Sequence, residues 1–264
     1  MKKNVLATVV VLLVSSFALA QAKAPTVRSP RQRRSISTNG GSQCGQDPLL
    51  ITDGSSVEDF VALNTPNWYL VHLKAGHSYS VEVWDAIDSV IGGTASLAMI
   101  ATDCITTIPT TSVTSVDPDL SGSFGARVSW IQAADTDAYV RLDTSDPSGN
   151  IYEIRATDTT LYNQRWSTWS GFQTQYSFIN NSEAPISGTL TIYGTTGNVI
   201  RTVPVSVSAA NQFYYIFSTP VTTVGYATFA FVGPAGSITA DAYMLNSNAT
   251  VVVQSSFGAR NYQH

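Results

Sequence analysis

Two tryptophans and a tyrosine lie among amide, guanidinium and hydroxyl side chains in residues 162–172. Aromatic rings offer apolar faces to sugar rings, while amide and guanidinium groups donate hydrogen bonds to hydroxyls. Because Trp166 and Trp169 are three residues apart, an extended strand would point them to opposite faces. The alternative is therefore that one of them fills a core and the other covers a domain interface. We predict a binding surface made of Tyr162, Arg165, Trp166 and Trp169.

A second set of oxygen-bearing side chains occupies a short loop. Asp143, Asp146 and Asn150 lie close together in the sequence, and carboxylate and amide oxygens are the ligands that calcium takes. The spacing lacks the terminal glutamate of an EF-hand loop. The alternative is that both aspartates hydrogen-bond to their own backbone in turns. We expect no cofactor, with calcium at these three residues as the open alternative.

Groups suited to acid–base or nucleophilic catalysis are sparse. The histidines are His72, His77 and His264, and the sequence has neither a Gly-x-Ser-x-Gly elbow nor a His-Glu-x-x-His motif. Because His72 and His77 are five residues apart, they would lie on opposite faces of an unbroken strand. We expect no carboxylate partner for either of them. Neighbouring carboxylates such as Asp135 and Asp137 are typical of turns rather than of a glycosidase cleft. We predict that the protein is not an enzyme.

Cys44 and Cys104 are the two cysteines of the chain. An even number of cysteines in an oxidising compartment usually forms disulfides. Neither cysteine lies in a CxxC pair, and no histidine is placed to activate a thiol, so a reactive cysteine is the weaker alternative. We predict a disulfide between Cys44 and Cys104 that closes a loop of about sixty residues.

Residues 1–20 have the pattern of a secretory signal peptide. Two lysines precede an apolar run at 5–20, which ends in the small-x-small sequence Ala-Leu-Ala. A membrane anchor is the alternative, although the run is short for one. Residues 21–43 are polar, basic and rich in turn formers, and they predict a flexible linker. We expect the mature chain to be secreted, either extracellular or periplasmic, and to have no membrane span.

The charge balance excludes one class of partner. Charged residues make up 12% of the chain, and its formal net charge is −4. Because five of the basic residues lie in the linker, the part from Cys44 onward carries 7 basic and 18 acidic side chains. Such a surface would repel phosphate backbones, so nucleic acid is not an expected partner. The hydrophobic share of 44% excludes disorder throughout the chain.

Short apolar runs between turn residues predict β-strands in the first half. Residues 78–83 alternate and place Tyr79, Val81 and Val83 on one face. Residues 68–73 precede them, and the turn residues between the two runs predict a β-hairpin. Further strands are expected at 95–101, 127–131, 138–142 and 151–155. We predict a β-sandwich over 44–157.

The second half has its own set of strands and fewer charges. Adjacent Tyr214 and Tyr215 should point one ring inward and one outward. A series of short strands in about a hundred residues is typical of an immunoglobulin-like sandwich, which we place at 158–264. The fold class is therefore all-β, with two tandem β-sandwich domains of jelly-roll or immunoglobulin-like type and no long helix. The expected strands are 175–180, 188–193, 199–207, 212–218, 225–232, 237–245 and 249–254.

The first half resembles the bacterial pre-peptidase C-terminal domain, a β-sandwich of secreted proteins. Residues 67–81 carry the aromatic strand, the Lys-Ala-Gly turn and the Tyr-x-Val strand, and residues 137–142 and 148–154 carry the later ones. The resemblance covers about 57–157, with Asn67 where the family often has aspartate. It implies an accessory role beside a catalytic domain, and some relatives with a similar sandwich bind collagen or calcium.

The second half is similar to small sandwich modules of uncharacterised exported bacterial proteins. The shared residues are Leu-Tyr-x-x-Arg-Trp at 161–166, Gly-Pro-x-Gly-x-Ile at 233–238 and Ala-Asp-Ala-Tyr at 240–243. This similarity implies no function. We predict an exported, non-catalytic binding or structural module whose ligand is a glycan, a matrix protein or a partner surface. The alternatives are an accessory protein of a secreted hydrolase and, less favoured, a carboxylate-dependent hydrolase.

Overall fold

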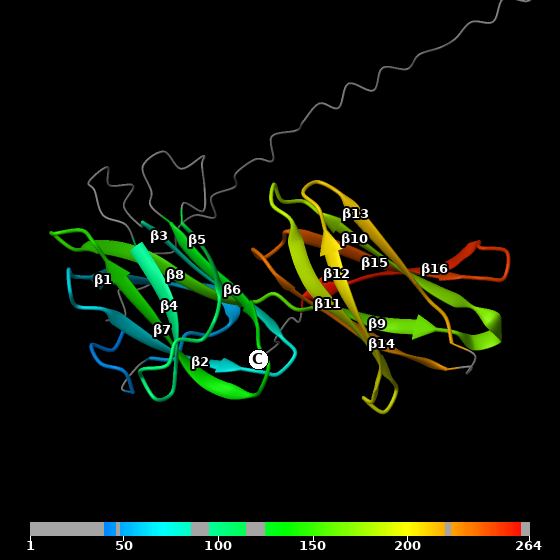
Figure 1. Ribbon diagram of the computed structural model, residues 1–264, viewed down its shortest axis with the longest axis horizontal. Coiled ribbons are helices and arrows are strands. Elements are labelled where there is room, and N and C mark those ends of the chain that lie inside the picture. The colour runs from blue at the N-terminus through cyan, green and yellow to red at the C-terminus, as the bar shows by residue number, and fades with distance from the viewer. Residues whose placement is uncertain (1–39, 46–47, 86–94, 115–124, 220–222, 260–264) are drawn as a thin grey trace, which may run out of the picture. The chain divides into compact units, whose positions relative to one another are not determined.

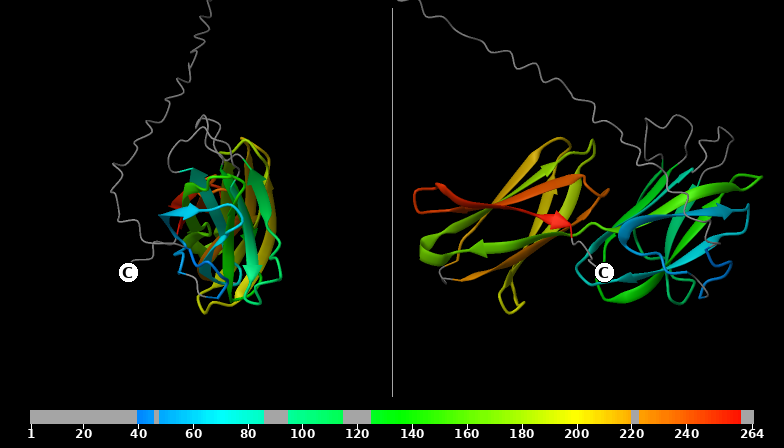
Figure 2. Two further views of the ribbon diagram at one scale, coloured as in Figure 1. Left: turned by 90° about the vertical axis from the view of Figure 1, so that its left-hand side faces the viewer. Right: turned by 180° about the vertical axis from the view of Figure 1, so that it is seen from behind.

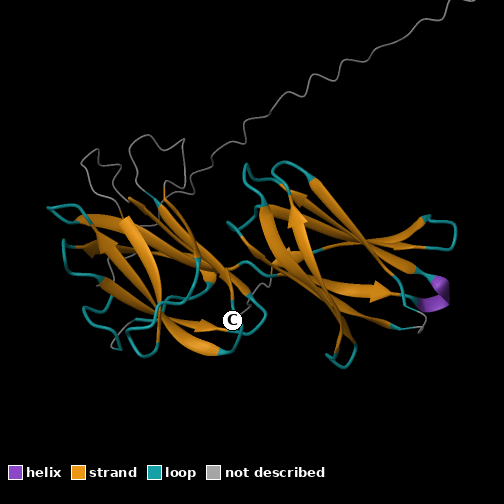
Figure 3. Cartoon of the chain, viewed as in Figure 1, coloured by secondary structure: helices purple, strands orange, loops and turns teal. Residues whose placement is uncertain are grey.

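The computed structural model describes residues 40–45, 48–85, 95–114, 125–219 and 223–259. The predicted leader and residues 21–39 of the predicted linker lie outside these ranges. In the described part the chain consists of antiparallel strands, and its one helical element is the 3-10 turn η1 (Trp169–Gly171) (Figure 3). The all-β prediction is confirmed. Among the described residues no helix is long and apolar enough to cross a membrane.

Eight strands in the first half form two antiparallel sheets (Figure 1). The five-stranded sheet has the order β1 (Asp53–Val61), β8 (Asn150–Asp158), β3 (Ser78–Asp85), β6 (Ala126–Ile131) and β5 (Thr111–Thr114). The three-stranded sheet has the order β2 (Asn67–Leu73), β7 (Thr136–Thr144) and β4 (Ala95–Ala101).

The inward faces of these sheets form one hydrophobic core. Tyr79, Val81 and Val83 of β3 all belong to it, as their alternation predicts. Val140 and Leu142 of β7 lie in the same core from the other sheet. Strands β1 to β8 therefore form a β-sandwich with its own apolar interior.

The predicted hairpin between 68–73 and 78–83 is wrong. β2 pairs with β7, whereas β3 pairs with β6 and β8, so the chain crosses from one sheet to the other. The crossing is fixed by the backbone amide of Gly76, which donates to Gln132, and by the Tyr79 hydroxyl, which accepts from the amide of Lys74. Turn residues fit a reversal within a sheet and a crossing between sheets equally well, so the local sequence does not separate the two.

The folded part begins before Cys44, where the predicted linker was expected to end. Gly41 exchanges two backbone hydrogen bonds with Trp68, and the amide of Gly40 donates to the carboxylate of Asp59. A Cβ atom at Gly40 would lie 2.7 Å from the Cβ of Asn67, so only glycine fits there. Gly40, which belongs to the run that predicted flexibility, instead allows the N-terminal segment to approach β2 closely.

Asp59 is the centre of this N-terminal attachment. Its side chain is only 2% exposed, and it accepts hydrogen bonds from the Asn67 amide, the Tyr69 hydroxyl and the backbone amides of Gly40 and Phe60. Burial and the bond to Asp59 raise the pKa of Tyr69. A buried carboxylate is tolerated only when its lone pairs are satisfied in this way.

Cys44 and Cys104 form a disulfide with a Cα–Cα distance of 5.9 Å, as predicted. The bridge joins the N-terminal segment to the loop after β4 and spans 60 residues of sequence. In the chain-entropy model a loop of this length stabilises the folded state by about 4 kcal/mol, because it restricts the unfolded chain.

The second half of the described chain forms two further antiparallel sheets. One has the order β13 (Gln212–Phe217), β10 (Gln173–Asn180), β15 (Ile238–Leu245) and β16 (Val251–Ser256). The other has the order β12 (Val199–Val207), β11 (Ile186–Gly194), β14 (Val224–Val232), β9 (Leu161–Ser167) and β17 (Gly258–Ala259).

A second hydrophobic core lies between these two sheets, and it is dominated by aromatic rings. Phe178 of β10 contacts Phe229 of β14, with ring centroids 4.4 Å apart. Trp166 and Phe217 meet edge to face at 5.0 Å. The core residues of the second half are distinct from those of the first, which gives two β-sandwiches as the fold class predicts.

Two buried tyrosines should make the protein sensitive to alkali. Burial raises the pKa of Tyr69 in the first core and of Tyr176 in the second, so the folded state holds both as neutral phenols. Their contribution is fully present below the ordinary tyrosine pKa of about 10 and is lost as the pH rises above it. Each should cost about 1.4 kcal/mol of unfolding free energy per pH unit above 10.

Denaturant unfolding at pH 9, 10 and 11 measures this slope. Tyr69→Phe should reduce the loss of unfolding free energy per pH unit in the first sandwich, and Tyr176→Phe should reduce it in the second. Tyr214→Phe, at an exposed position, should leave this slope unchanged. An unfolding free energy that is constant across this pH range would contradict the prediction.

Candidate binding site

Two edge strands of the second sandwich diverge and leave a groove between them. β9 pairs with β14 along one side, and along the other it pairs with β17 only at Leu161 and Tyr162. β16 is the last strand of the opposite sheet and pairs only with β15 among the described strands. Figure 2 shows β16 and β17, in red, ending beside β9. The open edges of both sheets thus face the same groove.

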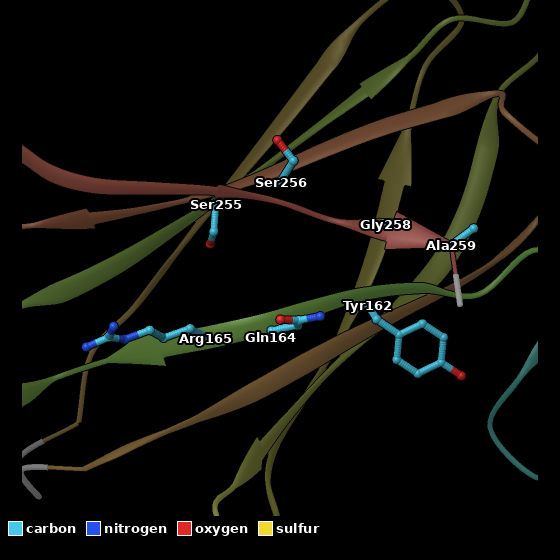
Figure 4. A pocket seen from close by; sticks show the side chains of 7 residues that line it. All are labelled: Tyr162, Gln164, Arg165, Ser255, Ser256, Gly258 and Ala259. Carbon is cyan, nitrogen blue, oxygen red and sulfur yellow. The ribbon is translucent and has the colours of Figure 1, made fainter. Parts of the chain in front are cut away.

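The groove has a volume of about 640 Å³, which is in the range of small-molecule sites. At one place the strands are tied together, because the side-chain amide of Asn163 donates to the hydroxyl of Ser255 at 2.8 Å. Figure 4 shows Ser255 pointing toward β9 and Ser256 pointing away from it. The lining residues are Tyr162, Gln164, Arg165, Ser255, Ser256, Gly258 and Ala259.

A β-bulge sets the directions of the side chains along β9. The register with β14 shifts between Asn163 and Trp166, so Gln164 and Arg165 together oppose the single residue Tyr226. Both residues consequently point outward, and both are exposed. The extra residue also returns Trp166 to the core side of the strand. Bulges of this kind re-aim side chains at sheet edges.

Trp166 is completely buried and does not line the groove. Its indole N–H donates to the backbone carbonyls of Tyr193 and Tyr226, at 2.9 and 3.0 Å. Gly225 makes room for the ring, because a Cβ there would lie 2.8 Å from the indole nitrogen and would overlap the carbonyl oxygen of Tyr193. Of the two readings of this tryptophan, the structure supports the one in which it fills the core.

Trp169, in contrast to Trp166, is exposed. It belongs to η1, after the end of β9, and is 61% exposed. It is not among the residues that line the groove. Of the four residues predicted to bind a ligand, the structure therefore brings Tyr162 and Arg165 together, leaves Trp169 exposed elsewhere and buries Trp166.

Arg165 is the cation of the groove. Arg127, Arg141 and Arg155 each lie within 4.0 Å of a carboxylate, whereas within the described residues Arg165 has no such partner. An exposed guanidinium has five donors in a planar fork that matches a carboxylate or sulfate group. Beside it, Gln164 adds an amide and Ser255 a hydroxyl. The groove is therefore rich in hydrogen-bond donors.

The hydroxyl of Tyr162 is engaged by a histidine. His77 contacts it through Nε2 at 3.2 Å, and the Nδ1 atom of the same ring lies 2.7 Å from Asp158. His72 in turn lies 2.6 Å from Asp137. The expectation that neither histidine would have a carboxylate partner is wrong, since both partners come from residues distant in sequence. His77 thus engages the hydroxyl of Tyr162, and Tyr162 also lines the groove.

Two of the residues predicted to bind calcium, Asp143 and Asp146, have other partners in this structure. Asp143 forms an ion pair with Arg141 at 2.9 Å, and Asp146, only 4% exposed, accepts from the amide of Ser148 in its own turn. The side chain of Asn150 lies outside the described residues. No group of three histidine, cysteine or acidic side chains with metal-binding geometry occurs in the described part. For Asp146, the turn reading fits these contacts.

Comparison with known proteins identifies no family. No family and no curated protein matches the chain. A structure of Bacteroides uniformis beta-glucuronidase 2 covalently bound to cyclophellitol-6-carboxylate aziridine is 12% identical, with a TM-score of 0.18, and the match covers 74% of this chain and 26% of that one. Another crystal structure of Bacteroides uniformis beta-glucuronidase is 11% identical, with a TM-score of 0.17 and the same coverage. The chain spans about a quarter of these enzymes, and neither similarity carries an argument.

Proposed function

We propose that this protein is an exported, non-catalytic binding module that holds an acidic glycan in the groove between β9 and β16. The observation that carries the proposal is Arg165, an exposed guanidinium without a carboxylate partner in the described chain, in a cavity of about 640 Å³. A carboxylate or sulfate group of a sugar would supply the missing partner. The Tyr162 ring would offer an apolar face to the sugar.

The remaining lining groups support a sugar ligand. Gln164 and Ser255 can each bond a hydroxyl, and the exposed backbone of Gly258 and Ala259 lets a ligand approach closely. The seven lining residues include no carboxylate, histidine or cysteine. We therefore propose binding rather than turnover at this groove.

The distribution of charge also supports an anionic ligand at this place. Although the chain as a whole is acidic, residues 161–264 contain three arginines and only two carboxylates. The repulsion that an anionic polymer would meet at the first sandwich is therefore weaker here. The leader-like N-terminus and the resemblance of 57–157 to the pre-peptidase C-terminal domain support export.

Arg165→Ala should weaken the binding of an acidic polysaccharide by about 10- to 100-fold. Hydrogen bonds to a charged group contribute about 1.5–3 kcal/mol, and the ligand would lose two of the best-placed donors. Affinity electrophoresis in gels that contain alginate or polygalacturonate tests carboxylated sugars, and gels with heparin or carrageenan test sulfated ones. Binding should also weaken as salt concentration rises.

Arg201→Ala is the matched control, because Arg201 is an exposed arginine on β12 of the same sandwich but outside the groove. Its removal changes the net charge equally and should leave retardation intact. If both variants lost the same amount of retardation, the binding would depend on net charge and not on the position of Arg165. No retardation by any of the four polymers would overturn the proposal.

A further inference from the structure

The outward face of the sheet β13-β10-β15-β16 carries apolar side chains that the core does not use. Tyr214 and Ile216 of β13 are 54% and 53% exposed, and Tyr243 of β15 is half-buried on the same face. Their neighbour Tyr215 points inward and packs against the core, so the two adjacent tyrosines face opposite ways, as predicted. None of these side chains lines the groove. The two surfaces meet at Ser256, which lines the groove and pairs with Asp241 of this face.

The sheet register places these residues side by side. Ser177 pairs with Tyr214 on one side and with Asp241 on the other. One step along, Gln175 lies between Ile216 and Tyr243. Because neighbouring strands are about 4.8 Å apart, the side chains of β13 and β15 stand about 10 Å apart across small or flexible residues. Tyr214 and Ile216 thus lie on one side of Ser177 and Gln175, and Tyr243 lies on the other; we call these residues, with Asp241 and Gln254, the strip.

Polar groups surround the rings. The carboxylate of Asp241 accepts a hydrogen bond from the Ser256 hydroxyl at 2.7 Å and lies 3.5 Å from the hydroxyl of Tyr243. Partial burial, then the charge of Asp241 and its hydrogen bond, and last the electrostatic effect of Tyr214, raise the pKa of Tyr243. Gln175 and Gln254 lie on either side of Tyr243 in the register. Two amides and a carboxylate thus lie beside the Tyr243 ring.

The opposite sheet shows what a purely structural tyrosine pair looks like. Tyr193 and Tyr226 are cross-strand neighbours with ring centroids 4.7 Å apart and planes only 10° from parallel. Each ring covers one face of the other. No ring contact of this kind joins Tyr214 or Tyr243 to another described aromatic residue. Within the described chain, Tyr214 and Tyr243 therefore lack the aromatic partner that Tyr193 and Tyr226 give each other.

We propose that this face binds a neutral polysaccharide, with Tyr214 and Tyr243 stacking on its sugar rings. Asp241 is the one formal charge among the residues of the strip, and a carboxylate accepts hydrogen bonds from hydroxyls but repels anions. The amides of Gln175 and Gln254 can both donate to and accept from hydroxyls. This chemistry differs from that of the groove, where Arg165 favours an acidic sugar, and it does not depend on that site.

The test is native affinity electrophoresis of the full chain in gels that contain xylan, mannan, barley β-glucan or soluble starch. At least one polymer should retard the protein, and Tyr214→Ala and Tyr243→Ala should each weaken that binding about tenfold or more. Tyr193→Ala is the matched control, since it removes a tyrosine from the outer face of the opposite sheet. Circular dichroism of each variant verifies the fold.

The experiment distinguishes this face from the groove. Arg165→Ala should leave binding to the neutral polymer unchanged, and Tyr214→Ala should leave binding to the acidic polymer unchanged. Retardation by none of the four neutral polymers overturns the inference, as does retardation that survives both tyrosine substitutions. Concentration-dependent dimerisation that Tyr214→Ala abolishes, without polysaccharide binding, would assign the face to a second copy of the chain and would also overturn it.

Discussion

Asp59→Ala is expected to lower the unfolding free energy of the first sandwich by about 3–5 kcal/mol, because it leaves several buried donors unpaired at about 1–3 kcal/mol each. The substitution would strand the Tyr69 hydroxyl, the Asn67 amide and the Gly40 backbone amide without their acceptor. Each buried donor left unpaired is costly, and the N-terminal attachment through Gly40 would be lost with them. Thermal and denaturant unfolding of the full chain measure the loss.

Asp135→Ala provides the comparison for this effect. Asp135 also accepts a backbone hydrogen bond, from Ala75 at 2.7 Å, but it is exposed, so water can replace the lost acceptor. We expect a change of less than about 1 kcal/mol there. If Asp59→Ala proved as mild as the control, the hydrogen-bonded cluster would not be what holds the N-terminal segment in place.

Trp166→Ala should destabilise the second sandwich by a similar amount, about 3–5 kcal/mol, because it opens a large cavity in a packed core. The two carbonyls of Tyr193 and Tyr226 that share its N–H would also lose a donor. Trp166→Phe retains much of the apolar volume, so we expect a smaller loss. Denaturant unfolding, followed by circular dichroism, resolves the series.

Trp169→Ala is the control, because this side chain is 61% exposed. Its stability should remain within about 0.5 kcal/mol of the parent protein. Affinity for an acidic polysaccharide, measured below the unfolding transition of each variant, should be unaffected by either tryptophan substitution. A specific loss of affinity in Trp169→Ala would return this residue to the binding surface that the sequence predicts.

Most strand positions were predictable in this chain because period-2 alternation directly reflects which face is buried, but β1, β5, β9 and β17 were not among the expected strands. The strands at 95–101 and 199–207 coincide with β4 and β12, and most others differ by one to three residues. The pairing of β2 and β3 with partners in different sheets was not predictable, since it depends on contacts with β7, β6 and β8 that are distant in sequence. The Asp59 cluster was missed for the same reason.

The candidate site was half predictable. The segment that contains Tyr162 and Arg165 was singled out by its residue types, and the structure places both in the groove. The bulge at Gln164 and Arg165 breaks the alternation on which facing is judged, so sequence alone could not decide whether Trp166 or Trp169 is buried. The local sequence around Ser255 and Ser256 does not predict a binding site, because these residues line the groove only through their position opposite β9.

The fit between Trp166 and Gly225 has a consequence for how this sequence can diverge. The indole occupies the space that a side chain at position 225 would need, and that glycine also leaves room for the Tyr193 carbonyl. A larger residue at position 225 would displace the Trp166 ring from the core. A smaller residue at position 166 would leave a cavity beside Gly225. In orthologues, Gly225 should therefore be retained wherever Trp166 is retained, and because a Cβ there would still overlap the Tyr193 carbonyl, the glycine should also persist where the tryptophan is replaced.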